Sequence, residues 1–491
     1  MSHALPLYRV EQVRAIERAA AAHGMNPASL MDRAGKSAAA LVAERWPSVQ
    51  RIGVLCGKGN NGGDGYVAAL VLLKAGFDVV VAGAGPSATE EARAAQHAWR
   101  DVGQGVVALG GPLPRTALWI DALFGVGLSR APDAISAQAI AAVREQGVPV
   151  LALDVPSGLD ADRGCAPGVV LPATLTLCFI AAKQGLLTAT ARDVVGELLI
   201  DALGVPADAF SAVSPSALAV AEPALRAALP VRTSDSHKGY HGRVLCIGGS
   251  EGMGGALALC AEAAARCGAG WVDAAGSAEA IAALRVRCPE VLGAALISAE
   301  GLDARMAVAT VLALGPGLGL LPMARSLFHA ALASGLPMVV DADALNLLAE
   351  APCPMPQNIL TPHPGEAGRL LGVSTSDVQN DRYAALDALV QRFECAVVLK
   401  GAGTLVGAPG QVTRVVQAGN AAMASAGMGD VLTGVIAALR AQGLPAFDAA
   451  WVGALAHSAA GDRAAKGASR GLLASDLLPE LRVVLNARSA A

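Results

Sequence analysis

One stretch near the end of the chain combines a carboxylate with a backbone geometry that binds anions. Gly427-Met428-Gly429-Asp430-Val431-Leu432-Thr433-Gly434 predicts a glycine turn that leads into a helix over 431–440. Glycines let backbone N–H groups approach an anion closely, and a helix N-terminus adds unpaired donors and the positive end of a dipole. Asp430 at the junction is either a helix cap or a base directed at a bound group.

Other residues of the second half that could do chemistry follow predicted buried strands. Lys400-Gly401-Ala402-Gly403-Thr404 combines a charge, small residues and a hydroxyl, which suits a phosphate or the adenosine part of a nucleotide. His363 lies between two prolines, and both a structural and a functional role stay open. Asp341 and Asp343 could serve a divalent metal through water, but this spacing is common and a structural role is favoured.

The first half carries a polar glycine-rich segment over 57–66, between a predicted strand over 51–56 and a helix over 67–75. Strand, glycine loop and helix form the geometry of a nucleotide-binding first turn, although the spacing matches neither G-x-G-x-x-G nor a P-loop. Asn60, Asn61 and Asp64 add oxygens and amides that can bind a phosphate or a cation.

Two more predicted strands of the first half end in aspartates, at Asp121 and Asp154, and Ser157 follows closely. A single Asp after a strand is usually a helix cap. In open α/β sheets, however, ligands bind beyond the carboxyl ends of the strands, so three polar strand ends predict a site whose oxygens could hold a cation. Lys183 could reach the same crevice or could be a solvated lysine.

The elements that must position these residues alternate between short buried strands and helices in both halves. This rhythm predicts an α/β protein with two doubly wound domains, the first a Rossmann-like three-layer sandwich. The length of 491 residues also favours more than one domain. An Ala/Pro/Ser-rich stretch over 204–235 places the boundary near 215–225, which gives domains 1–215 and 225–491.

Composition excludes several classes of function. The net charge is −4 and no Lys/Arg block occurs, so we expect no nucleic-acid partner. We find neither a signal peptide nor an apolar run of the roughly 18 residues that a membrane span needs, so we expect a cytoplasmic protein. The nine cysteines are scattered without C-x-x-C spacing and read as buried thiols. Apolar helices at the start of each domain suit homo-oligomer contacts.

Three motifs of the first half resemble the NAD(P)H-hydrate epimerase family. They are Gly59-Asn60-Asn61-Gly62-Gly63-Asp64-Gly65-Tyr66, Asp121-Ala122-Leu123-Phe124-Gly125-Val126-Gly127-Leu128 and Leu153-Asp154-Val155-Pro156-Ser157-Gly158-Leu159. The resemblance implies interconversion of the R and S epimers of hydrated NADH or NADPH, with Asp154 as proton shuttle. It also implies a potassium site at Asn61, Asp121 and Ser157. The implied substrate-binding residues are Asn60, Asn61, Gly62, Gly63, Asp64, Gly125, Val126, Gly127, Leu128, Ser129, Arg130, Ala131 and Asp154.

The second half resembles the NAD(P)H-hydrate dehydratase family, a branch of the ribokinase-like fold. The motifs are Gly248-Gly249-Ser250, Gly315-Pro316-Gly317-Leu318-Gly319, Asp341-Ala342-Asp343-Ala344-Leu345-Asn346, Thr361-Pro362-His363-Pro364-Gly365-Glu366, Lys400–Thr404 and Gly427–Gly434. Two departures from the family pattern are Met428, where Thr or Ser is usual, and Thr174, where an acidic residue is expected.

This second resemblance implies that the S epimer is dehydrated at the expense of ADP, with magnesium. Asp430 would be the base, and Lys400, Gly401, Ala402, Gly403, Thr404 and Gly429 would bind the nucleotide. Ala256, Gly317, His363 and Asp430 would hold the hydrated cofactor. Two rival hypotheses stay open: a ribokinase-like small-molecule kinase, and a first domain that binds nucleotides without catalysis.

Overall fold

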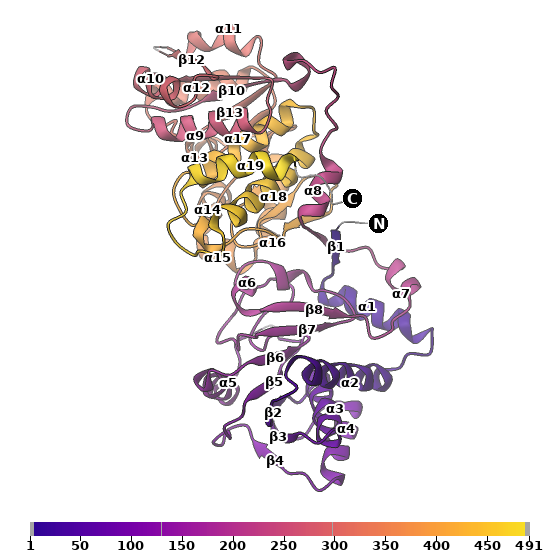
Figure 1. Ribbon diagram of the computed structural model, residues 1–491. Coiled ribbons are helices and arrows are strands. Elements are labelled where there is room, and N and C mark those ends of the chain that lie inside the picture. Colours follow the sequence, from indigo (N-terminus) through magenta and orange to yellow (C-terminus); the bar gives the residue numbers. More distant parts are fainter. Residues whose placement is uncertain (1–3, 129, 297, 487–491) are drawn as a thin grey trace. The chain divides into compact units, whose positions relative to one another are not determined.

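The computed structural model describes residues 4–128, 130–296 and 298–486 (Figure 1). The described chain divides into two compact units, Pro6–Ala217 and the residues from Leu218 to 486, which are joined by Ala4 and Leu5. The first strand, β1 (Ala4–Leu7), pairs with β9 (Ala217–Val220) at one end of the second unit's sheet. The predicted division into 1–215 and 225–491 stays a prediction. The pairing of β1 with β9 joins segments too far apart in the sequence for local patterns to reveal.

The first unit contains a seven-stranded sheet in the order β4-β3-β2-β5-β6-β7-β8, and every pair of neighbours is parallel. The chain moves outward on one side from β2 and then returns to β5 on the other side. This reversal between β2 and β5 is the switch point of a Rossmann-like sheet, which confirms the predicted architecture. The strands are β2 (Arg51–Cys56), β3 (Asp78–Gly83), β4 (Val106–Ala108), β5 (Leu118–Ala122), β6 (Val150–Leu153), β7 (Leu175–Phe179) and β8 (Glu197–Asp201).

Helices cover both faces of this sheet and give it three layers. Figure 1 shows α2, α3 and α4 together on one side and α5 on the other. Ile52 and Val54 of β2 pack into the core under α2 and α3, whereas Leu55 and Trp119 pack into the core under α5. The helical segments are α1 (Val10–Ala21), α2 (Pro27–Arg45), α3 (Asn60–Lys74), α4 (Glu90–Asp101), α5 (Ala134–Gln146), η1 (Gln184–Leu187), α6 (Ala191–Val194) and α7 (Ala207–Ser211).

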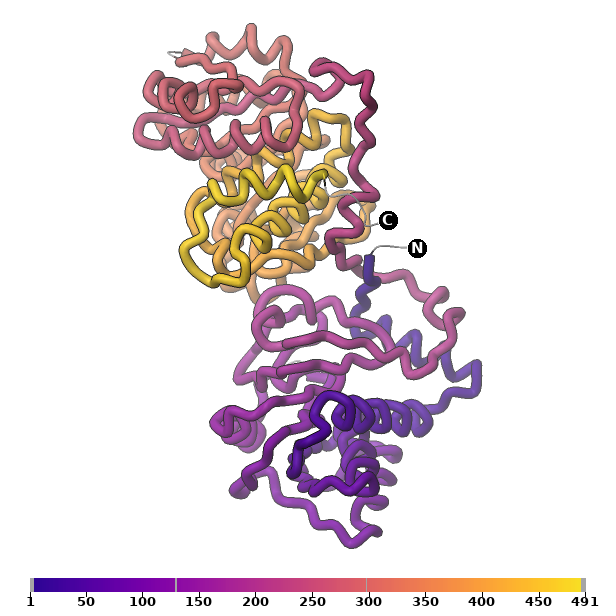
Figure 2. Tube along the Cα trace, viewed as in Figure 1, coloured from indigo at the N-terminus to yellow at the C-terminus, as the bar shows by residue number. Residues whose placement is uncertain are grey.

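The early helices lie beside the last strand of this unit. In Figure 2 the indigo chain of α1 lies beside the magenta chain that follows β8. Arg33 donates from Nη1 to the carbonyl oxygen of Leu203 at 2.8 Å, and Ser37 donates to the carboxylate of Asp201. These contacts attach the start of the unit to its end, so the unit folds as a single body.

The second unit contains an eleven-stranded sheet in the order β1-β9-β18-β17-β16-β15-β14-β13-β10-β11-β12. Its strands from β16 to β12 are parallel, and β17 runs antiparallel to both β16 and β18. The chain reverses direction across the sheet between β10 and β13. The strands not yet given are β10 (Arg243–Ile247), β11 (Trp271–Gly276), β12 (Leu292–Ala295), β13 (Val311–Leu314), β14 (Met338–Val340), β15 (Ile359–Leu360), β16 (Ala396–Leu399), β17 (Leu405–Gly407) and β18 (Thr413–Val416).

The helices of the second unit pack around a core of small residues. Gly434 of α17 lies against α9, where an added Cβ would be only 2.0 Å from the carbonyl oxygen of Cys260. The glycine therefore permits the close approach of the two helices. The helical segments are α8 (Glu222–Ala228), η2 (Lys238–His241), α9 (Gly254–Arg266), α10 (Ala278–Arg287), η3 (Ala299–Leu302), α11 (Asp303–Met306), α12 (Pro322–Ala333), α13 (Ala342–Glu350), α14 (Pro364–Leu371), α15 (Thr375–Asn380), α16 (Arg382–Phe393), η4 (Ala421–Met423), α17 (Met428–Ala441), α18 (Ala446–Ala465), η5 (Ala474–Asp476) and α19 (Leu477–Asn486).

Two predicted helix starts were wrong, and both concern motif residues. The structure begins α3 at Asn60 and α17 at Met428, whereas helices were predicted from 67 and 431. Asn60 to Asp64 are therefore the first helical residues after a Gly59 cap, and Asp430 is the third residue of α17. Glycine weakens helix propensity, so pattern analysis reads such segments as loops, but tertiary packing overrides that preference.

Replacement of Gly434 by Ala tests the helix contact. The added methyl group would overlap the backbone of α9, so we expect the second unit to lose about 1–3 kcal/mol of its free energy of unfolding. Scanning calorimetry of the whole chain measures the shift. Gly255→Ala is the matched control, because no atom lies within 4 Å of its added Cβ, and it should not lower the transition temperature. Equal transitions for Gly434→Ala and the wild type would contradict the packing argument.

Candidate functional sites

The candidate site of the first unit lies at the carboxyl ends of its strands, beside the switch point. The N-terminus of α3 follows β2, and the segment after β5 passes over it, because an added Cβ at Gly125 would lie 3.2 Å from the Cβ of Asn61. Asn60 accepts a hydrogen bond from Thr89 Oγ1 at 2.5 Å. The structure thus brings the residues after β2 and β5 together, as the strand-end argument predicts.

Asn61, Asp121 and Ser157 provide oxygen atoms at this point. The carboxylate of Asp121 is fully buried and accepts from Ser157 Oγ at 2.6 Å and from Ser157 N at 2.8 Å. Burial raises the pKa of Asp121 to about 6, against the lowering effect of these bonds. The side-chain oxygen and nitrogen of Asn61 are buried without a protein partner among the described residues. An unpaired buried amide is costly unless a ligand or ion completes it, so this donor set fits a cation bound by oxygens.

Asp154 follows β6 and is held by a buried lysine. Its φ is 66°, in the left-handed region that non-glycine residues seldom adopt, and such strain concentrates at functional sites. Lys183 Nζ donates to Asp154 Oδ1, to the carbonyl oxygen of Phe179 at 2.8 Å and to Cys178 Sγ at 3.3 Å. Burial disfavours the ammonium, but the charges of Asp154 and Cys178 outweigh it and raise the pKa of Lys183. Of the two roles left open for Lys183, the solvated one is excluded, because only 1% of the side chain is exposed.

A second carboxyl group faces this pair. Burial raises the pKa of Asp64 well above its usual value, and the charges of Asp154 and Glu17 add to the effect. Burial and the charge of Asp154 also raise the pKa of Glu17, which lies on α1. The site therefore combines a carboxylate paired with a lysine and a neighbouring carboxyl group whose pKa is raised.

Two of the predicted substrate-binding glycines fill structural positions. An added Cβ at Gly62 would lie 2.0 Å from the carbonyl oxygen of Gly57, and one at Gly63 would lie 2.5 Å from the end of Met31. Their lack of side chains therefore serves packing, and only their backbone remains for a ligand. Gly125, Val126, Gly127, Leu128, Arg130 and Ala131 form an irregular, partly exposed segment after β5, and Ser129 lies outside the described residues.

The candidate site of the second unit centres on a buried ion pair between residues that follow β14 and β16. Lys400 Nζ donates to Asp341 Oδ1 at 2.7 Å and lies 3.7 Å from Glu366 Oε2. Thr433 of α17 donates to Asp341 Oδ2 at 2.9 Å. Burial would raise the pKa of Asp341, but Lys400 outweighs it and lowers that pKa. The sequence favoured a structural role for Asp341. In the structure its carboxylate holds Lys400 at the centre of the candidate site.

The N-terminus of α17 is built directly against this pair. Gly427 has φ 88°, which favours glycine, and Gly429 lies so close that an added Cβ would be 3.2 Å from both Asp341 Oδ2 and Lys400 Nζ. Met428, where the family usually has a hydroxyl, is buried in the core. The backbone of Met428 bonds to His457 of α18, whose pKa burial lowers to about 4, so that the ring is neutral.

Asp430 has the properties of a base. Among the described residues it has no hydrogen-bond or ion-pair partner, and its side chain is partly exposed at the helix N-terminus. Burial and the negative charge of Asp341 raise its pKa to about 7, while Lys400 opposes the rise. A partly exposed carboxyl group with a pKa near neutrality suits proton abstraction, and the structure shows no capping bond from this side chain.

The predicted substrate residues of this unit fall in two places. Gly317 has φ 61°, and an added Cβ there would lie 3.2 Å from the Cβ of Ala256, so these two residues form one wall at the switch between β10 and β13. His363 caps α14, where Nδ1 accepts from Gly365 N at 3.0 Å and from Glu366 N. Its side chain is still 51% exposed, and burial and Lys400 lower its pKa.

A buried arginine behind the predicted nucleotide loop was not found from sequence. Arg382 donates from Nη2 to the carbonyl oxygen of Leu399 at 3.0 Å and from Nη1 to that of Lys400 at 3.3 Å. An added Cβ at Gly401, with φ 139°, would lie 2.8 Å from the guanidinium. Arg382 therefore shapes the turn Lys400–Thr404 from behind. Because it lies on α16 outside every motif, only its three-dimensional contacts reveal it.

Among the residues that the structure describes, neither site carries a cluster typical of a protein-held transition metal. Within the described ranges, no group of three or more His, Cys, Asp or Glu residues could hold a metal ion. Over the same ranges, no helix is long and apolar enough to cross a membrane. Thr174, a departure from the family pattern, accepts a hydrogen bond from Val150 N at 3.2 Å and so supports the sheet.

Comparisons with known proteins cover both units. The family model described as YjeF-related protein N-terminus matches residues 27–185, and the model described as NAD(P)H-hydrate dehydratase matches residues 244–482. The chain is 44% identical to the bifunctional NAD(P)H-hydrate repair enzyme Nnr of Coxiella burnetii, over 98% of this chain and 99% of the relative. The chain belongs to the family of bifunctional NAD(P)H-hydrate repair enzymes. The Escherichia coli enzyme of this name is 41% identical over 98% of the chain and 94% of its own length.

Solved structures support the fold of the second unit. A ribokinase-like superfamily protein from Enterococcus faecalis matches with a TM-score of 0.51 and 27% identity, over 54% of this chain and 94% of that structure. A protein from Streptococcus mutans gives the same TM-score with 31% identity, over 54% and 98%. Together with the strand order, these matches confirm the ribokinase-like fold predicted for the C-terminal half of this family member.

The charges around Asp430 can be tested by titration. Lys400→Met removes the positive charge that lowers the pKa of Asp430, so that pKa should rise above about 7. Asp343→Asn removes a negative charge that raises it, so the pKa should fall. Carbon-13 NMR of aspartate-labelled protein follows the carboxyl group, which Asp430→Asn identifies by loss of its signal. Lys466→Met, at the end of α18, is the control and should leave the midpoint in place. A fall in Lys400→Met would refute the assignment.

Proposed function

We propose that the chain repairs hydrated nicotinamide nucleotides in two steps. The first unit interconverts the R and S epimers of hydrated NADH or NADPH, and the second unit dehydrates the S epimer at the expense of ADP. The observation that carries this proposal is the unpaired Asp430 carboxyl group beside the Lys400–Asp341 pair at a helix N-terminus. The family membership supplies the substrate.

The dehydration needs an activated leaving group, because hydroxide leaves poorly. Asp430 would take the proton of the C6 hydroxyl, whose oxygen then attacks the terminal phosphorus of ADP and releases AMP. The ring nitrogen lone pair expels inorganic phosphate, and loss of a proton from C5 restores the double bond of NADH. The N–H groups at the start of α17 would stabilise the phosphate charge during transfer. The hydrated cofactor and ADP are thus converted to NADH, AMP and phosphate, and the oxygen of the C6 hydroxyl leaves in the phosphate.

The residues present fit a nucleotide with its own magnesium ion. The turn Lys400–Thr404 and Gly429 would bind the nucleotide, while Ala256, Gly317 and His363 would border the hydrated cofactor. Magnesium usually takes one or two carboxylates plus substrate phosphates and water, and the site offers no larger acidic cluster. A bound magnesium ion would supply charge neutralisation for the phosphates. Lys400 is already paired with Asp341 and Glu366, so it contributes one fixed positive charge at the same place.

Epimerisation passes through loss and return of hydroxide at C6. The lone pair of the ring nitrogen can open a planar iminium, which water attacks on either face. Asp154 would move the proton, while Lys183 holds the carboxylate in place and the nearby Asp64 has a raised pKa. Asn60 to Asp64 and the segment 125–131 would hold the dinucleotide. A potassium ion at Asn61, Asp121 and Ser157 would supply a positive charge, and the unpaired Asn61 amide fits it.

Recovery of NADH absorbance from a mixture of both epimers tests both steps. With ADP and magnesium, the wild-type protein should convert the whole mixture, whereas Asp154→Asn should convert only the S share. Asp430→Asn should convert neither epimer to NADH but should still equilibrate the two, as chromatography shows. Near wild-type recovery by Asp430→Asn would refute its role. Transfer of phosphate from ATP to an alcohol, without any NADH recovery, would instead favour the small-molecule kinase.

The pH dependence of dehydration follows from the raised pKa of Asp430. Only the carboxylate accepts the hydroxyl proton, so kcat/KM should increase with pH through a midpoint near 7. Between pH 6 and pH 8 the ionised fraction increases about tenfold for such a group, and the initial rate on the S epimer should follow it. A rate that is flat across this range would show that the ionisation of Asp430 does not control dehydration.

A further inference from the structure

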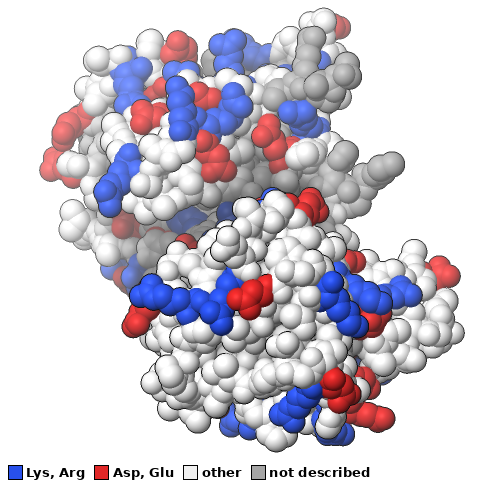
Figure 3. Space-filling model, turned by 60° about the horizontal axis from the view of Figure 1, so that its bottom comes forward, with Lys and Arg blue, Asp and Glu red and all other residues white. Residues whose placement is uncertain are grey.

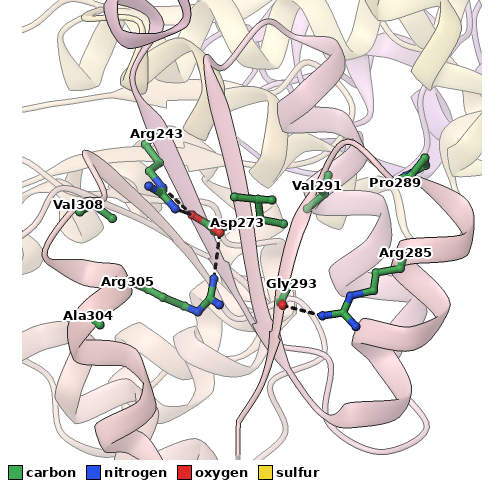
Figure 4. Close-up of a pocket in the computed structure, with 10 residues that line it drawn as sticks. Arg243, Asp273, Arg285, Pro289, Val291, Gly293, Ala304, Arg305 and Val308 are labelled. Atoms are coloured by element: carbon green, nitrogen blue, oxygen red, sulfur yellow. Dashed lines mark hydrogen bonds and ion pairs between the residues drawn. The ribbon is translucent and has the colours of Figure 1, made fainter.

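A pocket in the second unit lies away from the site around Asp430. Figure 4 shows it beside the first residues of β10, β11 and β12, with α10 on one side and α11 on the other. The candidate nucleotide site occupies the opposite, carboxyl ends of the parallel strands, so at least the length of β10 separates the two places. A five-residue strand spans roughly 13 Å between its first and last residues. The volume of the pocket is about 620 Å³, within the size range of small-molecule sites.

Three arginines and one aspartate supply the charges of this pocket. Asp273 is buried, and its carboxylate accepts from Arg243 Nε at 2.5 Å and from Arg305 Nη1 at 2.9 Å. Arg285 extends from α10 and donates from Nη2 to the carbonyl oxygen of Gly293 at 3.1 Å (Figure 4). Three positive charges and one negative charge leave two positive charges in excess. On the face shown in Figure 3, by contrast, positive and negative side chains are interspersed.

The guanidinium groups keep donors that protein atoms do not use. Arg285 makes this single hydrogen bond within the described part of the chain, and Arg305 bonds only to Asp273 there. Each guanidinium has five N–H donors in a planar fork, so several stay available. Asp273 fixes Arg243 and Arg305 in place, which lowers the entropy cost of binding a further anion. Arginine forks match phosphate oxygens in pairs, whereas a single carboxylate neutralises only one charge.

The remaining walls of the pocket are apolar. Leu292 is 43% exposed and Val308 is 51% exposed, although both are large aliphatic residues, and Pro289 lies between α10 and β12. A pocket with two excess positive charges and aliphatic walls fits a ligand that carries a dianionic group on an apolar body. We propose that this pocket binds a small organic phosphate, such as a phosphate monoester, at a site separate from both catalytic sites.

Calorimetric titration of the full chain with phenyl phosphate tests the proposal. Phenol and inorganic phosphate are titrated separately, so that the apolar body and the charged group of the ligand are each tested alone. The wild type should bind phenyl phosphate more tightly than either arm, and higher NaCl concentration should weaken the binding. R285Q/R305Q should weaken it at least tenfold, since two charge-assisted donors are lost. R287Q is the matched control, because Arg287 lies on the same helix but pairs with Glu262 and does not line the pocket. It should bind as the wild type does.

Other outcomes would overturn the proposal. They are absence of phenyl phosphate binding at millimolar concentration, equal binding by R285Q/R305Q and the wild type, and an equal loss in R287Q. If R285Q/R305Q does not fold, R285Q alone replaces it, because that exposed side chain makes one hydrogen bond and its loss should weaken binding severalfold. Recovery of NADH absorbance is measured in the same samples as a separate readout of the repair activity. Neither Arg285 nor Arg305 belongs to the catalytic sites, so a failure of this proposal can be told from a failure of the proposed function.

Discussion

The buried ion pair of Asp341 and Lys400 is the interaction on which the second unit's site depends. It connects the ends of β14 and β16 and meets α17 through Thr433. Loss of one partner from a buried pair typically costs about 3–5 kcal/mol, because the other charge stays buried and unpaired. Gly429 lies against both partners, so the position of the helix N-terminus follows from the position of the pair. Arg382 then holds the carbonyl oxygens beside Lys400 from behind.

The first unit uses the same electrostatic arrangement on a different sheet. Lys183 neutralises Asp154 as Lys400 neutralises Asp341, and each lysine is held in its charged form although it is buried. In each unit a further carboxyl group nearby has a raised pKa, Asp64 in the first and Asp430 in the second. A lysine that already has a partner cannot neutralise a second carboxylate fully. Each site therefore combines a fixed ion pair with a nearby carboxyl group whose pKa is raised by burial and by a neighbouring negative charge.

The strand rhythm and the strand-end rule predicted most of the architecture from sequence. They predicted two doubly wound α/β units, and they placed Asn61, Asp121 and Ser157 at one sheet edge, which the structure brings together. They missed features that depend on distant partners. The pairing of β1 with β9, the early start of α3 and the support from Arg382 leave no local pattern. These features can be recognised only from contacts between segments that lie far apart in the sequence.

The same limit explains why the pairing of Asp341 with Lys400 and the pocket lined by Arg243, Arg285 and Arg305 were not foreseen. An aspartate after a strand has the same local sequence whether it caps a helix or anchors a lysine, and only the register of β14 and β16 around β15 brings Lys400 to it. Arg243, Arg285 and Arg305 come from three elements and lie beside the amino ends of strands, where the strand-end rule predicts no ligand.

The charge arrangement also constrains how Asp430 can act. A diphosphate at the start of α17 would bring negative charge close to this carboxyl group and would raise its pKa further, which opposes its role as a base. Lys400 is committed to Asp341 and Glu366, so it offsets only part of that charge. The remaining compensation has to come from the N–H groups at the start of α17 and from a cation that accompanies the nucleotide. A cation bound with the nucleotide would therefore complement the proposed site, because one lysine that already has two carboxylate partners can offset only part of the charge of a diphosphate.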